Sequence, residues 1–316
     1  MENMEKPFVL AVVGPTASGK SWLGAELALK YGGEVVSADS MQIYKGMDIA
    51  SAKPSKEEMK GVPHHLISVI DRDTPFSAAD YVKMARGVIA DILSRGKLPI
   101  IVGGTGLYVD SLLNNVQFSE MKSDPAYRES LYELSRTRGN EALYAELVKA
   151  DPEAAESIHM NNTVRVVRAL EVIHLTGRRF SELKAESTAE ESPYDSLILG
   201  LNAEDRAVLY ERINMRVDEM VRAGLVEEAR AVWSEGNMRT AANAIGYKEL
   251  IPYFEGGMPL DECIALIKQE TRRYAKRQLT WFRRNERIRW IMTADFSKKY
   301  EILEKSEKAI ENYRRV

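Results

Sequence analysis

The sequence of 316 residues has almost nothing that could hold a fold together by cross-links. Its only cysteine is Cys263, which excludes a disulfide framework and any metal site built from several cysteines. No apolar run approaches the ~18 residues of a membrane span, and the run 8–13 is too short for a secretory signal. We therefore expect a cytoplasmic protein, with no membrane contact and a monomer favoured, that is stabilised by its hydrophobic core.

A strong charge of one sign is also missing, because 44 Lys and Arg residues face 47 Asp and Glu residues, for a net charge of −3. This balance excludes a protein that is basic over its whole surface. One segment departs from it, since residues 271–290 contain eight basic residues and one acidic residue. That segment carries +7, which leaves −10 for the rest of the chain. Local charge, not the mean, decides contact with phosphates.

Apolar runs alternate with helical patterns in the first part of the chain, which predicts βαβ units and a parallel sheet. The predicted strands are 8–13, 34–37, 66–70, 98–102 and 197–201, and the helices between the first four are 21–31 and 79–93. The stretch 118–194 shows helical patterns only and is predicted to be an inserted subdomain. We expect a P-loop NTPase-like or kinase-like α/β core (1–117), this insertion (118–194), and a last part (195–316) that completes the core and is helical from Asn202 onward.

The segment from Gly14 to Ser21, GPTASGKS, has the spacing of a P-loop between a predicted strand and a predicted helix. Its glycines allow the tight turn that points successive backbone N–H groups at phosphate oxygens. Lys20 would supply a positive charge to the phosphates, and the hydroxyl of Ser21 is placed to bind Mg²⁺. The motif predicts a phosphorylated ligand, but it distinguishes neither the ligand nor the reaction.

Polar residues follow other predicted strands, at the edge of the sheet where α/β proteins bind ligands. Asp39 follows the second strand and could bind metal, cap a turn or act as a general base. Thr105, in the glycine-rich segment 103–106, either faces the ligand or belongs to a tight turn. Asp71 is read as a partner of Arg72 or as a metal ligand, with the ion pair favoured.

The basic segment has a helical division of residue types. At 100° per residue, six cations between Arg272 and Arg284 cover an arc of about 140°, and aromatic and apolar residues cover the opposite arc. One face is expected in the core, and the other would bind RNA phosphates or serve as a solvated surface. In the insertion, Arg128, Arg165 and Arg168 are candidates for a lid over phosphates or for nucleic-acid contact.

Taken together, these segments resemble the tRNA dimethylallyltransferases, also called isopentenyl-tRNA transferases, over nearly the whole chain. The matching blocks are Gly14–Ser21, Ser37–Ile49, Ala52–Pro54, Pro63–Leu66, Val102–Tyr108, Arg165–Glu171, Ala244–Lys248 and Arg273–Arg283. Two features depart from the pattern of some members: Val164 replaces a glutamine, and the single cysteine excludes the zinc finger of eukaryotic members. The resemblance is therefore to the compact bacterial form.

The resemblance implies transfer of a dimethylallyl group from dimethylallyl diphosphate to N6 of the adenine 3′-adjacent to the anticodon in tRNA. It implies that the P-loop residues Gly14, Thr16, Ala17, Ser18, Gly19, Lys20 and Ser21 hold the diphosphate with Mg²⁺ rather than ATP. It assigns Asp39 as the general base and Thr105 to a place beside the leaving group, with Lys20 stabilising that group. It implies tRNA contacts for Asp39, Ser40, Met41, Gln42, Arg128, Arg165, Arg168, Ile245, Gly246 and Tyr247, and the basic helix adds Arg273 and Arg277.

Two other classes of function fit parts of the sequence. A P-loop kinase could bind ATP and phosphorylate a nucleoside or small metabolite, but it would not need the basic row. An RNA-binding regulator without catalytic activity would bind RNA and give no product.

Overall fold

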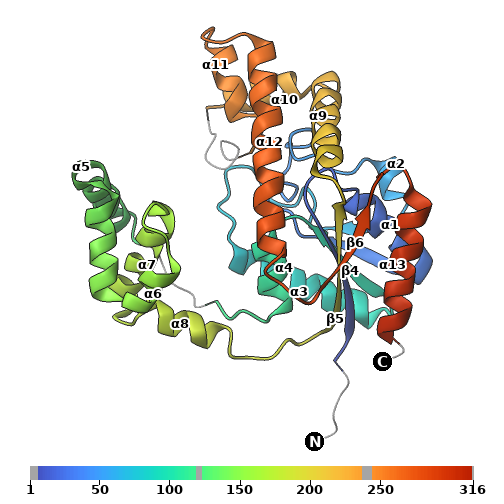
Figure 1. The fold of residues 1–316 in the computed structure, drawn as a ribbon, viewed down its shortest axis with the longest axis horizontal. Helices are drawn as coiled ribbons and strands as arrows, with labels where there is room; N and C mark the ends of the chain where they lie inside the picture. Colours follow the sequence, from blue (N-terminus) through green and yellow to red (C-terminus); the bar gives the residue numbers. More distant parts are fainter. Residues whose placement is uncertain (1–5, 119–122, 237–243, 315–316) are drawn as a thin grey trace, which may run out of the picture. The chain divides into compact units, whose positions relative to one another are not determined.

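The computed structural model describes residues 6–118, 123–236 and 244–314 (Figure 1). The chain forms two compact units, one of Met1–Leu113 with Pro193–Val316 and one of Asn114–Ser192. The borders expected from the sequence were 117/118 and 194/195. The first unit is an α/β structure and the second contains helices, as described in turn below.

A sheet of six parallel strands, in the order β3-β2-β4-β1-β5-β6, is the centre of the first unit. The strands are β1 Phe8–Val13, β2 Gly33–Ser37, β3 His64–His65, β4 Leu98–Gly103, β5 Asp195–Ala203 and β6 Ile288–Thr293. Strands β1, β2, β4 and β5 confirm the predicted runs within two residues at either end. Their continuous apolar sequence is explained by burial on both faces of the sheet.

Two predictions about strands were wrong, one because a predicted strand does not form and one because a strand was not predicted. The run 66–70 is not a strand, because Leu66 and Ser68 have φ angles of 61° and 54°, which interrupt an extended chain. The edge strand β3 instead lies just before it, and His65 there contacts the buried carboxylate of Glu34 at 2.7 Å. The prediction of helices throughout the C-terminal part missed β6, in which Ile288, Ile291 and Thr293 are buried and only Arg289 is exposed.

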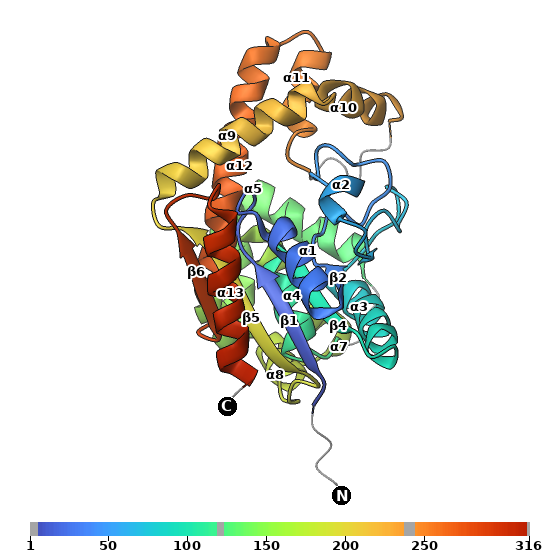
Figure 2. The ribbon, with the colours of Figure 1, turned by 90° about the vertical axis from the view of Figure 1, so that its right-hand side faces the viewer.

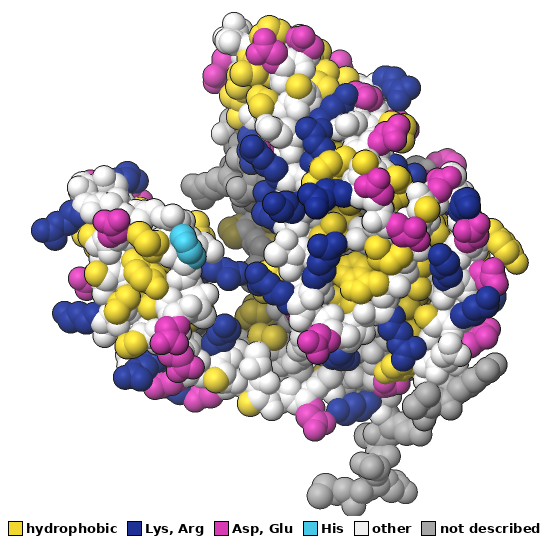
Figure 3. Space-filling model, in the orientation of Figure 1, with side chains coloured by type: hydrophobic (Ala, Val, Ile, Leu, Met, Phe, Trp, Pro, Cys, Tyr) yellow, Lys and Arg dark blue, Asp and Glu magenta, His cyan; other side chains and the backbone are white. Residues whose placement is uncertain are grey.

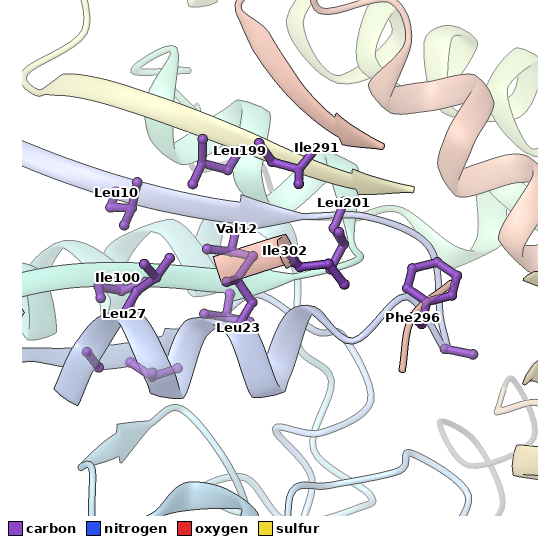
Figure 4. Packing of buried hydrophobic residues seen from close by; sticks show 14 of the residues in the cluster. Leu10, Val12, Leu23, Leu27, Ile100, Leu199, Leu201, Ile291, Phe296 and Ile302 are labelled. Atoms are coloured by element: carbon purple, nitrogen blue, oxygen red, sulfur yellow. The ribbon is translucent and has the colours of Figure 1, made fainter. Parts of the chain in front are cut away.

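Helices cover both faces of the sheet. On one face lie α1 Lys20–Tyr31 and α13 Lys299–Arg314, and on the other lie α3 Ala78–Ser94 and α4 Gly106–Leu113 (Figure 2). Figure 4 shows Leu23 and Leu27 of α1 and Ile302 of α13 against the side chains of Leu10 and Val12 in β1. The remaining helices of this unit are α2 Lys56–Met59, α9 Arg206–Arg222, α10 Leu225–Ser234, the 3₁₀ turn Lys248–Leu250, α11 Ile251–Phe254 and α12 Leu260–Phe282.

A separate cluster of buried residues joins α9, α10 and α12 to the segment 41–50. Helix α12 ends at Phe282, so Arg283 and Arg284 lie beyond the helix that the sequence assigned to them. Cys263 is a free, buried cysteine in this cluster. Within the described ranges, no helix has the length and apolar character to cross a membrane.

The second unit has its own hydrophobic core, built by its longer helices. The helices are α5 Pro125–Ala150, α6 Pro152–Ser157, α7 Thr163–Thr176 and α8 Phe180–Ser187. Asp124 and Asp151 accept hydrogen bonds from backbone N–H groups at the starts of α5 and α6, and proline follows each of them. Gly177 ends α7 in a left-handed conformation, and Gly139 interrupts α5.

Candidate functional site

The carboxyl ends of β2, β4 and β1 are adjacent in the sheet, so the three segments that follow them meet at one edge. These segments are the loop 14–19, the segment 38–42 and the glycine-rich loop 103–106. A cavity of about 560 Å³ opens beside them. Lining residues predicted from the sequence are Thr16, Ala17, Ser18, Gly19, Lys20, Ser21, Asp39, Ser40, Met41, Gln42, Ile245 and Arg277.

The loop 14–19 turns tightly between β1 and α1. Gly14 has a φ angle of 155°, and a Cβ atom there would lie 2.5 Å from the backbone oxygen of Leu201. Gly19 and Ala17 also have positive φ angles, of 86° and 61°. The hydroxyl of Ser18 is fully buried inside this loop and has no hydrogen-bond partner among the described residues. A buried polar atom without a partner is costly, so this hydroxyl is an unsatisfied group within the loop.

Lys20 begins α1, and its ammonium group contacts the backbone oxygen of Pro15 at 3.3 Å. Burial lowers the pKa of Lys20 to about 8, although the Asp39 carboxylate opposes the shift. Arg216 lowers it further. An enclosed ammonium group with a depressed pKa gains most from an anion that enters the cavity.

Two arginines of α9 that the sequence analysis did not single out also reach the cavity. The Arg212 guanidinium donates to the backbone oxygen of Ala17 at 3.0 Å and lies 4.8 Å from the centre of the Phe296 ring. Arg216 donates to the backbone oxygen of Ala52 at 3.3 Å, and burial lowers its pKa. Their i, i+4 spacing places them on one side of α9. The spacing is visible in the sequence, but nothing in the sequence indicates that this side of the helix faces the cavity.

Asp39 caps a turn, which is one of the roles considered from the sequence. Its Oδ1 atom accepts hydrogen bonds from the N–H groups of Met41 at 2.9 Å and Gln42 at 3.3 Å, which makes it a turn cap. These are the only hydrogen bonds to its carboxylate among the described residues. The turn orients the carboxylate on the cavity wall, near Lys20 and the phenol of Tyr274. Burial and the negative charge of Asp39 raise the pKa of Tyr274, which keeps that phenol protonated.

The glycines of the loop 103–106 are required by close contacts on two sides. A Cβ atom on Gly103 would lie 2.1 Å from the backbone oxygen of Ala38, and one on Gly104 would lie 2.1 Å from the side chain of Gln278. Thr105, between them and α4, accepts a hydrogen bond from the N–H of Ser40 at 3.0 Å. The threonine hydroxyl is therefore held next to the segment that carries Asp39.

Helix α12 confirms the two-sided reading of its sequence, with Ala275, Gln278 and Phe282 buried. On the other side Arg273 is exposed and pairs with Glu270, while Arg277 lies on the cavity wall near the ring of Tyr274. Figure 3 shows Lys and Arg side chains gathered along α12 and beside it. The basic face therefore borders the cavity.

The block Ile245–Tyr247 contributes to the site in different ways. Ile245 lines the cavity, whereas Gly246 and Tyr247 are buried. The Tyr247 hydroxyl donates to Glu228 at 2.8 Å, and the same carboxylate accepts the N–H groups of residues 48, 49 and 50. Tyr247 thus helps to fix the segment 48–50 instead of presenting a side chain at the surface.

The arginines predicted in the insertion lie in the second unit. Arg128 and Arg168 each make a 2.7 Å ion pair with Glu171, whose side chain is fully buried. Burial opposes ionisation of Glu171, but the two arginines outweigh it and hold its pKa below the ordinary range. Arg165 is exposed beside Val164, in the first turn of α7.

The other acid considered from the sequence lies elsewhere. Asp71 is exposed and pairs with Lys45, while Arg72 pairs with Glu235. Asp71 does not line the cavity at the P-loop. The arrangement as a whole joins a tight loop with P-loop spacing, three half-buried cations, one oriented carboxylate and a basic helix, a combination suited to a diphosphate next to a proton acceptor.

Comparison with known proteins finds a family model, curated relatives and solved structures whose descriptions agree with one another. A family model described as IPP transferase matches residues 42–285. A tRNA dimethylallyltransferase of Geobacillus thermodenitrificans is 51% identical over 91% of each chain, and one of Bacillus subtilis is 48% identical over 92% of each chain. A solved tRNA isopentenylpyrophosphate transferase of Bacillus halodurans matches with a TM-score of 0.71 and 43% identity, covering 98% of this chain and 99% of the other. A eukaryotic dimethylallyltransferase acting on tRNA matches with a TM-score of 0.82 and 30% identity, over 97% of this chain and 79% of that one.

Proposed function

Since the chain belongs to the IPP transferase family, we propose that it transfers a dimethylallyl group from dimethylallyl diphosphate to N6 of the adenine 3′-adjacent to the anticodon in tRNA. Dimethylallyl transfer to tRNA is the activity named for relatives that are about half identical to it. None of these relatives favours the kinase alternative. Because tRNA is the acceptor, we propose that the reaction takes place in the cytoplasm.

The diphosphate of the donor is proposed to bind at the loop 14–19 and the start of α1. The observation that carries this assignment is the enclosed group of Lys20, Arg212 and Arg216 around one tight loop. Asp39, Glu58 and Glu219 also line the cavity, but none of them forms an ion pair with these three cations among the described residues, so the cations can pair with an anion that enters. When the allylic C–O bond breaks, the leaving diphosphate gains charge, which these cations and the loop N–H groups stabilise.

Asp39 is proposed to accept the proton of the attacking amine. The lone pair of an exocyclic adenine amine is delocalised, so removal of its proton as the N6–C bond forms assists the reaction. The turn through Met41 and Gln42 holds the Asp39 carboxylate on the cavity wall. Thr105 lies next to this turn through its hydrogen bond with Ser40. We propose that it acts beside the leaving group.

Mg²⁺ is proposed to bind together with the diphosphate. No group of three His, Cys, Asp or Glu side chains among the described residues could hold a metal ion by itself. The cavity nevertheless offers the hydroxyl of Ser21, an oxygen donor of the kind that Mg²⁺ prefers alongside phosphate oxygens. When bound, the ion would neutralise charge on the leaving group.

The anticodon stem-loop is proposed to lie against the basic face of α12, with its phosphates near Arg273 and Arg277. A nucleotide in a loop leaves its stack at lower cost than a paired one, so the adenine can enter the cavity beside Arg277. Arg128, Arg165 and Arg168 of the second unit remain proposed tRNA contacts. For Arg128 and Arg168 the contact would involve groups already paired with Glu171.

The test is to incubate the protein with Mg²⁺, labelled dimethylallyl diphosphate and an anticodon stem-loop that contains adenines. We expect label in the RNA and release of diphosphate. No label in the RNA, together with ATP-dependent phosphorylation of a small substrate, would identify a kinase instead. RNA binding without any product would support the regulator.

Asp39→Asn sharpens the test, because asparagine keeps the oxygen that caps the turn and removes the base. We expect turnover to fall by about 10²–10⁴-fold with RNA affinity unchanged. Asp71→Asn is the matched control, since that acid lies outside the cavity. Near-normal turnover of Asp39→Asn would remove the role of general base.

A further inference from the structure

The buried side chain of Gln278 makes contacts that packing of the helix does not require. It belongs to α12 and is 5% exposed. Its Oε1 atom accepts a hydrogen bond from the N–H of Thr16 at 2.8 Å, and its Nε2 atom donates to the backbone oxygen of Gly104 at 2.9 Å. A single amide therefore joins the P-loop to the loop that carries Thr105.

The loop 103–106 leaves room for this amide. A Cβ atom on Gly104 would lie 2.1 Å from Nε2 of Gln278, and the same atom would lie 3.4 Å from the backbone oxygen of Gly14. One turn further along α12, the indole of Trp281 occupies the space beside Gly106, where a Cβ atom would lie 2.2 Å away. The Trp281 N–H also donates to Asp110 of α4 at 2.6 Å.

Gln278 is also the neighbour of the groups that would face RNA. Arg277 precedes it in sequence and lies on the cavity wall, and Tyr274, one turn earlier, also lines the cavity. The same turns of α12 thus carry cations on one side and, on the other side, the amide that connects the two loops. Only a side chain with both a donor and an acceptor can make this joint, because one loop offers an N–H and the other a carbonyl.

We propose that Gln278 is a positioning residue that sets the P-loop and the Thr105 loop at the separation needed for the reaction, and links both to the RNA-binding face of α12. The inference rests on the proposed function and goes beyond it. It assigns to α12 a part in assembling the site in addition to holding RNA. In the proposed function the diphosphate binds at the P-loop, and the segment 38–42 with the proton acceptor is hydrogen-bonded to Thr105 of the other loop. A small change in the separation of the two loops therefore lowers the rate more than the affinity.

The experiment compares Gln278→Met, which has a similar size and neither hydrogen bond, with Gln269→Met, an exposed glutamine of the same helix. Single-turnover rates and KM for the stem-loop RNA are measured with dimethylallyl diphosphate in excess. We expect Gln278→Met to lower the rate by about 10–100-fold with KM for RNA within about twofold. Gln269→Met should match the wild type, and Arg273→Ala should show the opposite split, with KM raised more than the rate is lowered.

Gln278→Glu covers the case in which the methionine variant does not fold. It keeps the size and the acceptor for the Thr16 N–H but loses the donor to Gly104, so a rate loss of about tenfold with unchanged KM is expected. A rate within about twofold of the wild type in either folded variant, or a loss confined to KM, overturns the inference. If the wild type itself transfers no label, the proposed function fails, and that result is separate from any difference between variants.

Discussion

Replacing Lys20 by methionine should stabilise the empty protein while abolishing diphosphate binding. The shift of the pKa of Lys20 from 10.5 to about 8 means that its charged form is disfavoured in the folded state. A difference of about 2.5 pKa units corresponds to about 3 kcal/mol at pH 7. Lys20 keeps partial contact with solvent in an open cavity. We therefore expect a gain of about 1–2 kcal/mol in the free energy of unfolding.

The stability penalty caused by Lys20 depends on pH in a direction that follows from its lowered pKa. Because the folded-state pKa of Lys20 lies below the unfolded-state value, the penalty is full below about pH 8 and disappears as the pH rises through 10.5. The stability difference between Lys20→Met and the wild type should therefore narrow between pH 7 and pH 10. Lys83→Met, at an exposed lysine of α3, serves as the control that shows no such change.

The assay is denaturant unfolding with and without inorganic pyrophosphate and Mg²⁺. Pyrophosphate at 100 times its Kd should stabilise the wild type by about 2.7 kcal/mol and leave the variant unaffected, so the order of stability reverses. A variant that is less stable than the wild type at pH 7 without ligand would refute the reasoning. A stability difference between Lys20→Met and the wild type that stays constant up to pH 10 would also refute it.

Three further perturbations test other parts of the site. Arg216→Gln should weaken pyrophosphate binding by at least about tenfold in titration calorimetry, whereas Arg222→Gln, at the exposed end of α9, should not. Arg277→Ala should weaken stem-loop binding and reduce the slope of log K against log salt by about 1, and an unchanged slope would mean that this cation meets no phosphate. Glu171→Gln leaves two arginines facing a neutral group, so the free energy of unfolding of residues 114–192 should fall by about 1–3 kcal/mol. Hydrogen exchange measures this change, and unchanged protection of these residues would contradict the prediction.

Several features of the site could be predicted because they are encoded within a few consecutive residues. The P-loop spacing from Gly14 to Ser21, the strand before it and the helix after it depend on local backbone conformation and a short apolar pattern. The position of Asp39 also follows from local order, since it comes directly after a buried strand. The two faces of α12 were predictable from helical periodicity.

Other features depended on residues that are distant in sequence. Glu171 takes its role from Arg128, on another helix, and β6 becomes a strand through its pairing with β5. The periodicity of α12 predicted that Gln278 is buried, but it could not show which backbone groups its amide would meet. Charge alone also left open whether Arg273 and Arg277 face solvent or a cavity.

A loop with P-loop spacing, a parallel α/β core and a basic helix could all be predicted from the sequence, because they follow from spacing and periodicity over short windows. The tertiary structure decided that Arg212 and Arg216 reach the P-loop region, that Asp39 and Thr105 lie on adjacent segments, and that Gln278 joins two loops from 174 and 262 residues away. The physical reason is that parallel strands are joined by crossovers. The order of strands in the sheet, which no local pattern encodes, therefore selects the side chains that share one cavity.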